Sequence, residues 1–211
     1  MFNARRAVER TQRSSGRSVP RSKPRRPGSS PVPTKKSGRQ QSKLILVLGG
    51  AASGKSQTAL DLAGGALPRA FVATGQDLDQ EMAERIRRHR ASRAPDWHTA
   101  EVPIDLVGWL RTHGSHYRTI VVDCLTLWLS NLQEQRVPDP VVPERVDELL
   151  QAIGTAQGRI ILVSNELGLG VVPMSQAGRR FRDVSGKMHQ QIAAAADEVY
   201  FILAGLTLRL K

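Results

Sequence analysis

The sequence has few of the groups that stabilise secreted proteins or anchor proteins in a membrane. Cys124 is the single cysteine among 211 residues, so no disulfide can form within the chain, which fits a reducing compartment. No stretch approaches the roughly 18 consecutive apolar residues of a membrane span. Arg5 and Arg6 form a twin-arginine pair, but no apolar stretch follows them, so a secretory signal is not expected. We therefore expect a cytoplasmic protein.

Acidic residues are nearly absent from residues 1–43. This segment contains thirteen of the 31 lysines and arginines, but only Glu9 of the 19 acidic residues. It therefore accounts for the whole formal net charge of +12, whereas residues 44–211 hold 18 basic and 18 acidic side chains. The segment is rich in Arg, Ser, Pro and Gly and poor in large apolar residues. We expect a disordered basic extension at 1–43 and one folded domain at 44–211.

Three interpretations of the basic extension stay open. It can be a solvated tail without a specific partner, a transit peptide, or an arm that contacts nucleic acid or another anionic surface. The balanced charge of residues 44–211 argues that the folded domain is not a general polyanion binder. We therefore do not expect nucleic acid as a partner, apart from non-specific contacts of the extension.

Short apolar runs rich in β-branched residues recur along the second segment, and helical patterns separate them. Several runs are apolar at consecutive positions, which is typical of parallel strands covered on both faces. The closing "LTLRLK" alternates instead and predicts an antiparallel hairpin at the edge of the sheet. The predicted strands are 44–48, 70–74, 119–124, 159–165 and 198–204, and the predicted helices are about 56–63, 79–90, 104–112, 125–135, 143–157 and 175–196.

The strongest local motif is "GGAASGKS", which fits the pattern G-x-x-x-x-G-K-[ST]. Small residues let backbone N–H groups surround phosphates, the lysine reaches the β- and γ-phosphates, and the serine hydroxyl can bind Mg²⁺. A strand-like run precedes the motif and a helical run follows it, as such a site requires. We predict an α/β fold of the P-loop (RecA-like) type, with a mostly parallel sheet flanked by helices. The predicted phosphate-binding residues are Gly49, Gly50, Ala51, Ala52, Ser53, Gly54, Lys55 and Ser56.

A P-loop also needs an acidic residue to hold the metal. Asp123 ends the run "TIVVD", and the carboxyl end of a parallel strand faces the ligand crevice. The alternative is that Asp123 caps the helix that follows it. Glu166 is a comparable carboxylate after "IILVSN", and its alternative is a plain loop residue. We predict Ser56 and Asp123 as the ligands of Mg²⁺.

Five further segments follow the P-loop in order: "VATGQDLDQEMAERI", "HRASRAPDWHTAE", "VVDCLTLWLSNL", "SNELGLGVVP" and "RRFRDVSGKMHQQIAAAADEVYFILAGLTLRLK". Together with the P-loop they resemble the bifunctional adenosylcobinamide kinase / adenosylcobinamide-phosphate guanylyltransferase family of cobalamin biosynthesis. The resemblance covers residues 44–211 and implies two reactions. ATP or GTP first phosphorylates the aminopropanol hydroxyl of adenosylcobinamide. GMP is then transferred from GTP to that phosphate through a guanylylated histidine, giving adenosylcobinamide-GDP and pyrophosphate.

The resemblance places the guanylylated histidine at His89, in the stretch "RIRRHRASR". An imidazole must be neutral to attack the α-phosphate of GTP, and adjacent guanidinium groups disfavour its protonated form. The same arginines can neutralise phosphate oxygens as pyrophosphate leaves. Without the other segments, the plain interpretation is a solvated histidine on a basic helix face. The resemblance thus assigns His89 and Lys55 as the catalytic residues.

Further nucleotide contacts are implied by the same resemblance. Glu101 is suited to accept hydrogen bonds from the N1–H and 2-amino groups of guanine. Near the C-terminus, a frequent Asn-Gln pair of the family is His189-Gln190 here. The family forms ring-like trimers, so a homotrimer is expected. The implied contacts are Ala73, Thr74, Gly75, Arg90, Ala91, Ser92, Arg93, Glu101 and Asp123.

Two other functions stay open on the sequence alone. A single-activity P-loop kinase of another small alcohol or nucleotide would use Lys55 and Ser56 and leave His89 incidental. A nucleic-acid-binding ATPase would use the basic extension, and its binding would depend steeply on salt. Covalent transfer of GMP to the chain separates the bifunctional enzyme from both alternatives.

Overall fold

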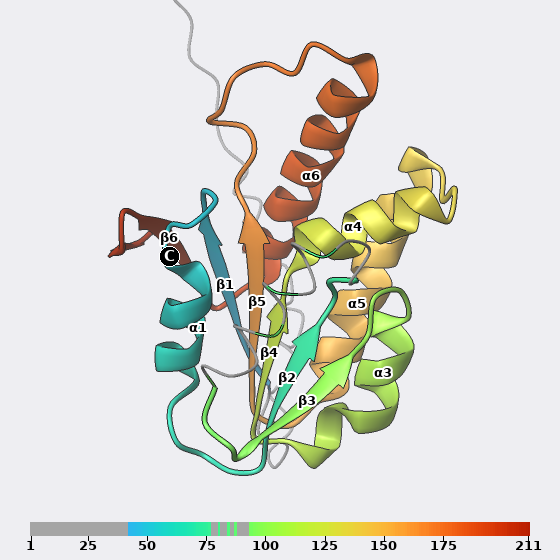
Figure 1. The fold of residues 1–211 in the computed structure, drawn as a ribbon. Coiled ribbons are helices and arrows are strands. Elements are labelled where there is room, and N and C mark those ends of the chain that lie inside the picture. The colour runs from blue at the N-terminus through green and yellow to red at the C-terminus, as the bar shows by residue number, and fades with distance from the viewer. Residues whose placement is uncertain (1–41, 77–79, 81–83, 85–86, 88–92) are drawn as a thin grey trace, which may run out of the picture. The chain divides into compact units, whose positions relative to one another are not determined.

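Seven strands form one sheet in the computed structural model, which describes residues 42–76, 80, 84, 87 and 93–211 (Figure 1). All of these residues fall within one compact unit. The sheet has the order β3-β2-β4-β5-β1-β6-β7. The strands are β1 (Lys43–Gly49), β2 (Arg69–Ala73), β3 (Trp97–Glu101), β4 (Thr119–Asp123), β5 (Arg159–Asn165), β6 (Glu198–Leu203) and β7 (Leu206–Arg209).

The sheet is parallel from β3 to β6. The P-loop strand β1 lies between β5 and β6, and both run parallel to it. On the other side of β5, strand β4 pairs with β5, and β2 pairs with both β4 and β3. Only β7 is antiparallel, in a hairpin with β6. The carboxyl ends of the six parallel strands therefore meet along one edge of the sheet, which is where ligands bind in folds of this kind.

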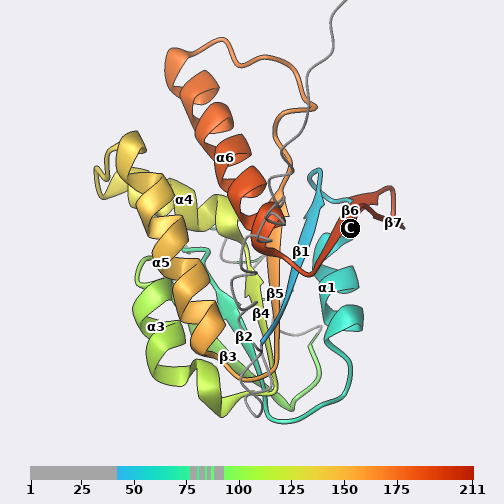
Figure 2. The ribbon, with the colours of Figure 1, turned by 180° about the vertical axis from the view of Figure 1, so that it is seen from behind.

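Helices cover both faces of the sheet, as Figures 1 and 2 show from opposite sides. Helix α1 packs on one face, and α3, α4, α5 and α6 pack on the other. Because parallel strands need crossover connections, helices on the faces are the expected partners of this sheet. The helices are α1 (Lys55–Ala63), α3 (Leu106–His113), α4 (Leu125–Glu134), α5 (Val142–Thr155) and α6 (Gln176–Ala195), with the short 3-10 turns η1 (Gly114–His116) and η2 (Asp139–Val141).

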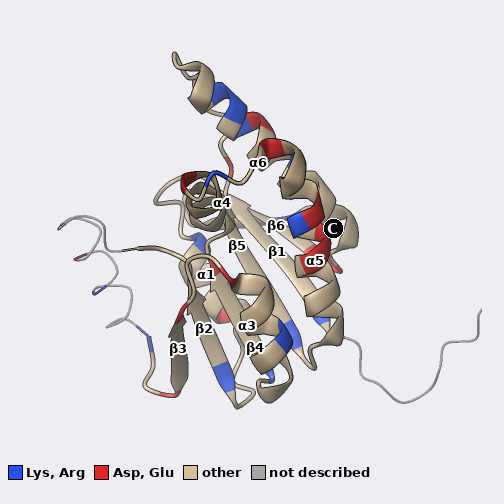
Figure 3. Ribbon diagram, turned by 90° about the vertical axis from the view of Figure 1, so that its right-hand side faces the viewer, with Lys and Arg blue, Asp and Glu red and all other residues tan. Residues whose placement is uncertain are grey.

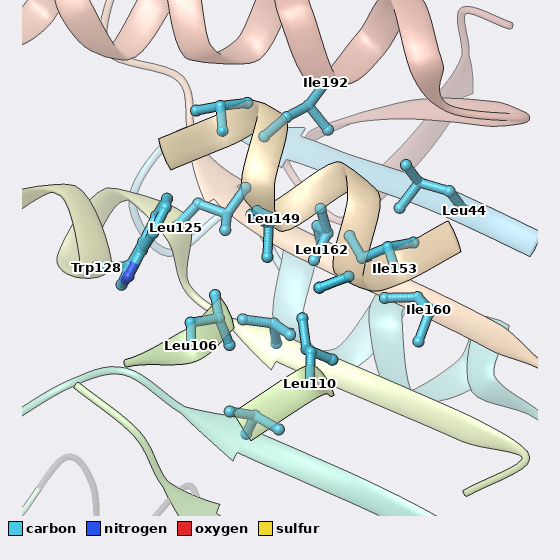
Figure 4. Packing of buried hydrophobic residues seen from close by; sticks show 14 of the residues in the cluster. Leu44, Leu106, Leu110, Leu125, Trp128, Leu149, Ile153, Ile160, Leu162 and Ile192 are labelled. Atoms are coloured by element: carbon cyan, nitrogen blue, oxygen red, sulfur yellow. The ribbon is translucent and has the colours of Figure 1, made fainter. Parts of the chain in front are cut away.

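The continuous apolar run of β1 supplies both faces of the sheet. Leu44, Leu46 and Leu48 belong to the buried cluster under α3 to α6, whereas Ile45 and Val47 belong to the cluster under α1. Side chains alternate between faces along a strand, so only a strand covered on both sides has apolar residues at every position. Figure 4 shows the larger cluster, in which leucines and isoleucines of the strands and helices interdigitate around the sheet.

The predicted fold class is confirmed, including the antiparallel edge hairpin. The five predicted strands and five of the six predicted helices end within about two residues of the observed elements. The predicted helix at 79–90 falls largely outside the described residues, although residues 80, 84 and 87 are helical. The strand Trp97–Glu101 was not predicted, because this edge strand is half-exposed and lacks a continuous apolar run.

The predicted extension at 1–43 lies outside the described residues, except for its last two positions. Lys43, the last residue of the predicted extension, is the first residue of β1. In Figure 3 the charged residues of the described part gather on the helices, notably α6, and at strand ends. Within that same part, no helix is long and apolar enough to cross a membrane.

Candidate nucleotide site

The motif "GGAASGKS" forms the turn between β1 and α1. Strand β1 ends at Gly49 and helix α1 begins at Lys55, so the residues between them form the loop of a P-loop. Gly54 caps the helix with φ of 98°, a left-handed conformation that side chains disfavour. A Cβ atom at Gly49 would lie 2.5 Å from the carbonyl oxygen of Ile202, so the backbone of β6 approaches there as closely as glycine permits.

One local hydrogen bond and two from distant segments hold this loop. The Nζ of Lys55 donates to the carbonyl of Gly50 at 2.8 Å, and the side chain is largely buried. The Gly205 N–H, in the turn of the C-terminal hairpin, donates to the carbonyl of Ser53 at 2.9 Å. The Glu166 N–H donates to the carbonyl of Gly49 at 2.9 Å. The loop is therefore fixed on both sides by segments from the second half of the chain.

The second group of predicted site residues lies at the ends of β2, β3 and β4. In the register of these strands, Ala73 is opposite both Asp123 and Glu101. Strand β5 separates β4 from β1, so Asp123 lies about 10 Å from the end of β1, and Glu101 on β3 about 19 Å from it. The predicted residues thus form two groups along one edge of the sheet, with the P-loop in one group and Glu101 in the other.

Thr74 is fully buried, and its hydroxyl binds the backbone of Cys124. The Oγ1 atom donates to the carbonyl of Cys124 at 2.6 Å and accepts from the N–H of the same residue at 2.8 Å. The N–H of Thr74 donates to the carbonyl of Asp123 at 3.2 Å. In this conformation the side chain of Thr74 therefore fixes the end of β4 and the start of α4, and so the position of Asp123.

Asp123 and the P-loop lysine Lys55 both act electrostatically on the thiol of Cys124. Burial raises the pKa of the Cys124 thiol to about 11, the adjacent Asp123 carboxylate raises it as well, and the ammonium of Lys55 opposes the shift. Both charges thus lie close enough to Cys124 to act on it. Helix α4 begins after Cys124, which is its N-cap, so the alternative that Asp123 caps this helix is wrong.

Mg²⁺ is implied by the P-loop, and the residues present fit it. Ser56, in the first turn of α1, and Asp123, at the end of β4, are both half-buried. A hydroxyl and a carboxylate are oxygen ligands of the kind that Mg²⁺ takes together with phosphate oxygens and water. No cluster of three or more histidines, cysteines or acidic residues suited to a metal occurs in the described part of the chain. Mg²⁺ bound with a nucleotide does not need such a cluster, because the phosphates supply further ligands.

Several predicted site residues lie outside the described residues. They are His89, Arg90, Ala91 and Ser92. The next predicted residue, Arg93, is described: its guanidinium lies 3.9 Å from the centroid of the Phe71 ring and donates to Thr99 Oγ1 at 3.4 Å. Arg93 is therefore held against β2 and β3, the strands that end at Ala73 and Glu101.

Sequence reasoning missed a buried polar network beside the P-loop. His189 on α6 is 5% exposed, and its Nε2 lies 2.8 Å from Ser164 Oγ, which in turn lies 2.9 Å from Thr126 Oγ1. The Nδ1 atom of the same imidazole lies 3.5 Å from Glu166 Oε2. The sequence offered one signal for this network, namely a histidine at helical spacing from Ser185 and Ile192, on one face of the predicted helix at 175–196.

The fold and this loop define a P-loop protein of the α/β class. Residues 45–210 match the family model described as cobinamide kinase / cobinamide phosphate guanyltransferase, and the chain therefore belongs to this family.

Two curated relatives align over nearly their whole length. The chain is 47% identical over 167 residues to the bifunctional adenosylcobalamin biosynthesis protein CobP of Pseudomonas aeruginosa, covering 79% of this chain and 96% of that protein. It is 33% identical over 180 residues to the bifunctional adenosylcobalamin biosynthesis protein CobU of Escherichia coli, covering 80% and 99%. Among solved structures, a KaiC-like protein, PH0186 of Pyrococcus horikoshii, matches with a TM-score of 0.46 and 15% identity, covering 75% of this chain and 70% of that chain.

Proposed function

We propose that this protein catalyses two consecutive steps of cobalamin biosynthesis. In the first, ATP or GTP phosphorylates the aminopropanol hydroxyl of adenosylcobinamide. In the second, GMP from GTP is joined to the new phosphate, which gives adenosylcobinamide-GDP and pyrophosphate. The observation that carries the proposal is the family match, which extends from residue 45 to residue 210 and so through β1 to β7.

The phosphorylation step is assigned to the P-loop. The backbone N–H groups of residues 49–54 bind the phosphates, and Lys55 neutralises the charge that develops on the transferred group. The position of Lys55 supports this role, since its ammonium lies beside the loop backbone at Gly50. Mg²⁺, held by Ser56 and Asp123, supplies electrostatic stabilisation of the phosphate oxygens when it is bound.

The GMP transfer is assigned to His89. Its imidazole attacks the α-phosphate of GTP, the bond to pyrophosphate breaks, and the resulting phosphoramidate then passes GMP to adenosylcobinamide phosphate. Arg90 and Arg93 lie on either side of Ala91 and Ser92 in the sequence and are assigned to the phosphates of GTP. Glu101, at the exposed end of β3, is assigned to the guanine edge, and Ala73, Thr74 and Gly75 to the backbone wall of the same site.

The decisive experiment is covalent labelling. Incubation with GTP labelled at the α-phosphate is expected to leave a label on the chain that is labile to acid and stable to alkali, as a phosphoramidate is. The variant His89→Ala should carry no label. The matched control is His116→Ala, because His116 is exposed on the η1 turn, away from the predicted site residues.

Each outcome of the labelling distinguishes the candidate functions. A label that survives in His89→Ala refutes the assignment of the nucleophile. A protein that transfers only the γ-phosphate, with no covalent GMP, is instead a single-activity kinase. Labelling with GTP carrying the label at the γ-phosphate is the internal control, since that label leaves with pyrophosphate.

The same proposal includes a cytoplasmic homotrimer. Four leucines of the C-terminal hairpin, which are between 58% and 75% exposed, support an apolar contact with another copy of the chain. They are Leu203, Leu206, Leu208 and Leu210. The absence of a second cysteine to pair with Cys124 within the chain is consistent with the cytoplasm. Light scattering coupled to size-exclusion chromatography should give three times the chain mass, and Leu206→Lys together with Leu208→Lys should reduce it; a monomeric wild-type protein contradicts the trimer.

A further inference from the structure

The carboxylate of Glu166 lies at the carboxyl edge of the sheet, directly beside the P-loop. The backbone N–H of Glu166 donates to the carbonyl of Gly49, the first residue of the loop motif. In the register of β1 and β5, Gly49 is opposite Asn165, so Glu166 is the first residue beyond the paired strands. The side chain is 21% exposed, which leaves part of the carboxylate open to a ligand at this edge. Glu166 therefore lies beside the loop that binds phosphates, at the edge of the sheet where ligands bind in this fold.

One hydrogen bond holds the carboxylate of Glu166, and the imidazole of His189 lies close to it. Oε1 accepts a hydrogen bond from the Gly168 N–H at 2.5 Å, and Oε2 lies 3.5 Å from Nδ1 of His189. The second distance is longer than the usual 2.7–3.2 Å of a hydrogen bond. Nδ1 is buried and has no other hydrogen-bond partner among the described residues. Glu166 Oε2 is thus an acceptor within reach of this nitrogen. Hydrogen bonds at catalytic sites commonly shorten when the substrate binds.

The hydrogen bonds of the network can all run in one direction. Burial lowers the pKa of His189, so the imidazole is neutral near pH 7 and carries one proton. With that proton on Nδ1, His189 donates to Glu166 and accepts from Ser164 through Nε2. Ser164 then accepts from Thr126, whose Oγ1 accepts from the Asn165 N–H at 2.8 Å. In this arrangement each of the two hydroxyls donates once, and a proton of His189 points at Glu166.

We propose that Glu166 is the general base of the phosphorylation step and that His189 is its positioning residue. This inference rests on the proposed function, since it takes a primary or secondary hydroxyl of adenosylcobinamide as the acceptor. In the step, the O–H bond of the acceptor breaks and its proton goes to the Glu166 carboxylate. The acceptor oxygen forms a bond to the γ-phosphorus, and the bond from that phosphorus to the β-phosphate oxygen breaks. The leaving group is the nucleoside diphosphate.

His189 acts through Glu166 and does not touch the substrate itself. Its imidazole is buried between α6 and β5, whereas the carboxylate of Glu166 reaches the surface. In the proposed step Nδ1 donates to Oε2, and this hydrogen bond restricts the orientation of the Glu166 carboxylate. Misplacing a catalytic group by about 1 Å costs roughly 100-fold in rate, so the orientation has a measurable effect.

The first test compares the two activities in Glu166→Gln, which keeps the shape but cannot accept the proton. We expect kcat for phosphorylation of adenosylcobinamide to fall about 100- to 10,000-fold, with the KM for ATP nearly unchanged. Covalent labelling with GMP should persist, because forming that intermediate requires no proton from the acceptor, and it also shows that the variant is folded. Glu144→Gln, at an exposed position of α5, is the matched control. A Glu166→Gln enzyme with wild-type kcat overturns the inference. A wild-type protein that does not phosphorylate adenosylcobinamide overturns the proposed function instead.

The second test separates positioning from simple stability with two variants of His189. The amide nitrogen of Asn can occupy the place of Nδ1 and donate to Glu166, whereas the amide of Gln can occupy the place of Nε2 and bind Ser164. We expect His189→Gln to lower kcat about 10- to 100-fold, and His189→Asn to lower it distinctly less. Combining His189→Gln with Glu166→Gln should add no further loss. Equal losses in the two single variants, or a full additional loss in the double variant, contradict the positioning role.

Discussion

Removing the hydroxyl of Thr74 tests whether the end of β4 depends on a single buried side chain. Valine has nearly the same shape as threonine, so Thr74→Val removes both hydrogen bonds to Cys124 and leaves the packing in place. The carbonyl of Cys124 keeps a partner, because it also accepts from the Trp128 N–H at 3.1 Å in the first turn of α4. The N–H of Cys124 has its described hydrogen bond to Thr74 only, so this one group is left buried and unpaired.

The expected loss of stability follows from that count. One buried, unsatisfied donor costs about 1–3 kcal/mol of unfolding free energy. With a denaturant slope of about 2 kcal/mol per molar urea, the midpoint of unfolding should fall by roughly 0.5–1.5 M. Thr74→Ser keeps the hydroxyl and loses one methyl group, so it measures the packing contribution alone, at about 0.5–1.5 kcal/mol.

Urea unfolding followed by circular dichroism measures this change in both variants. The slope should stay unchanged, because neither substitution alters the surface exposed on unfolding. A valine variant within about 0.5 kcal/mol of the wild type would show that the Cys124 N–H finds another partner, and the reasoning would be wrong.

Three further predictions concern groups around the site. Since burial raises the pKa of Cys124 to about 11, only about one thiol in a thousand is ionised at pH 8, so iodoacetamide should react far faster with the unfolded chain; equal rates contradict this. Asn131 donates to the carbonyls of Thr74 and Pro103, each at 2.8 Å, so Asn131→Ala should cost about 2–4 kcal/mol in urea unfolding, and a loss below about 1 kcal/mol would be inconsistent with two buried bonds. Burial lowers the pKa of His189 in the folded protein below 6.5, which is its value in the unfolded chain. At a pH between these two pKa values, His189 is protonated in the unfolded chain and neutral in the folded one. The free energy of unfolding should therefore fall as the pH drops from 7 to 5, and it should fall less steeply in His189→Asn. Parallel plots of unfolding free energy against pH for the two proteins would refute this contribution of His189.

The layers of the fold could be predicted from the sequence because burial leaves a direct pattern. Strands covered on both faces are apolar at every position, and β1, β4 and β5 have this pattern. Strand β3 could not be found in this way. It forms the outer edge of the sheet, so exposed positions interrupt its apolar residues, and its pairing with β2 depends on contacts between chain segments that a local pattern does not contain.

The candidate site was predictable where its residues are close in sequence. The P-loop is one continuous motif, and the strand-end position of Asp123 follows from the apolar run before it. The network of Thr126, Ser164 and His189 was not predictable, because its members come from α4, β5 and α6. Serine and threonine at such positions look like ordinary helix or strand residues until the packing of the three elements is known. Strand order likewise could not be read from the sequence, and it is strand order that sets the P-loop apart from Glu101.

The order of the strands also affects how the chain becomes able to bind a nucleotide during its synthesis. Strand β1 is made first among the strands, yet both of its neighbours, β5 and β6, come from the last third of the chain. The turn that supports Ser53, at Gly205, is later still. Until these segments leave the ribosome, the P-loop strand has an apolar run without partners on either edge, which is a typical target for chaperones and for aggregation. Phosphate binding is thus one of the last properties the nascent chain acquires, although its motif is among the first parts of the domain to be translated.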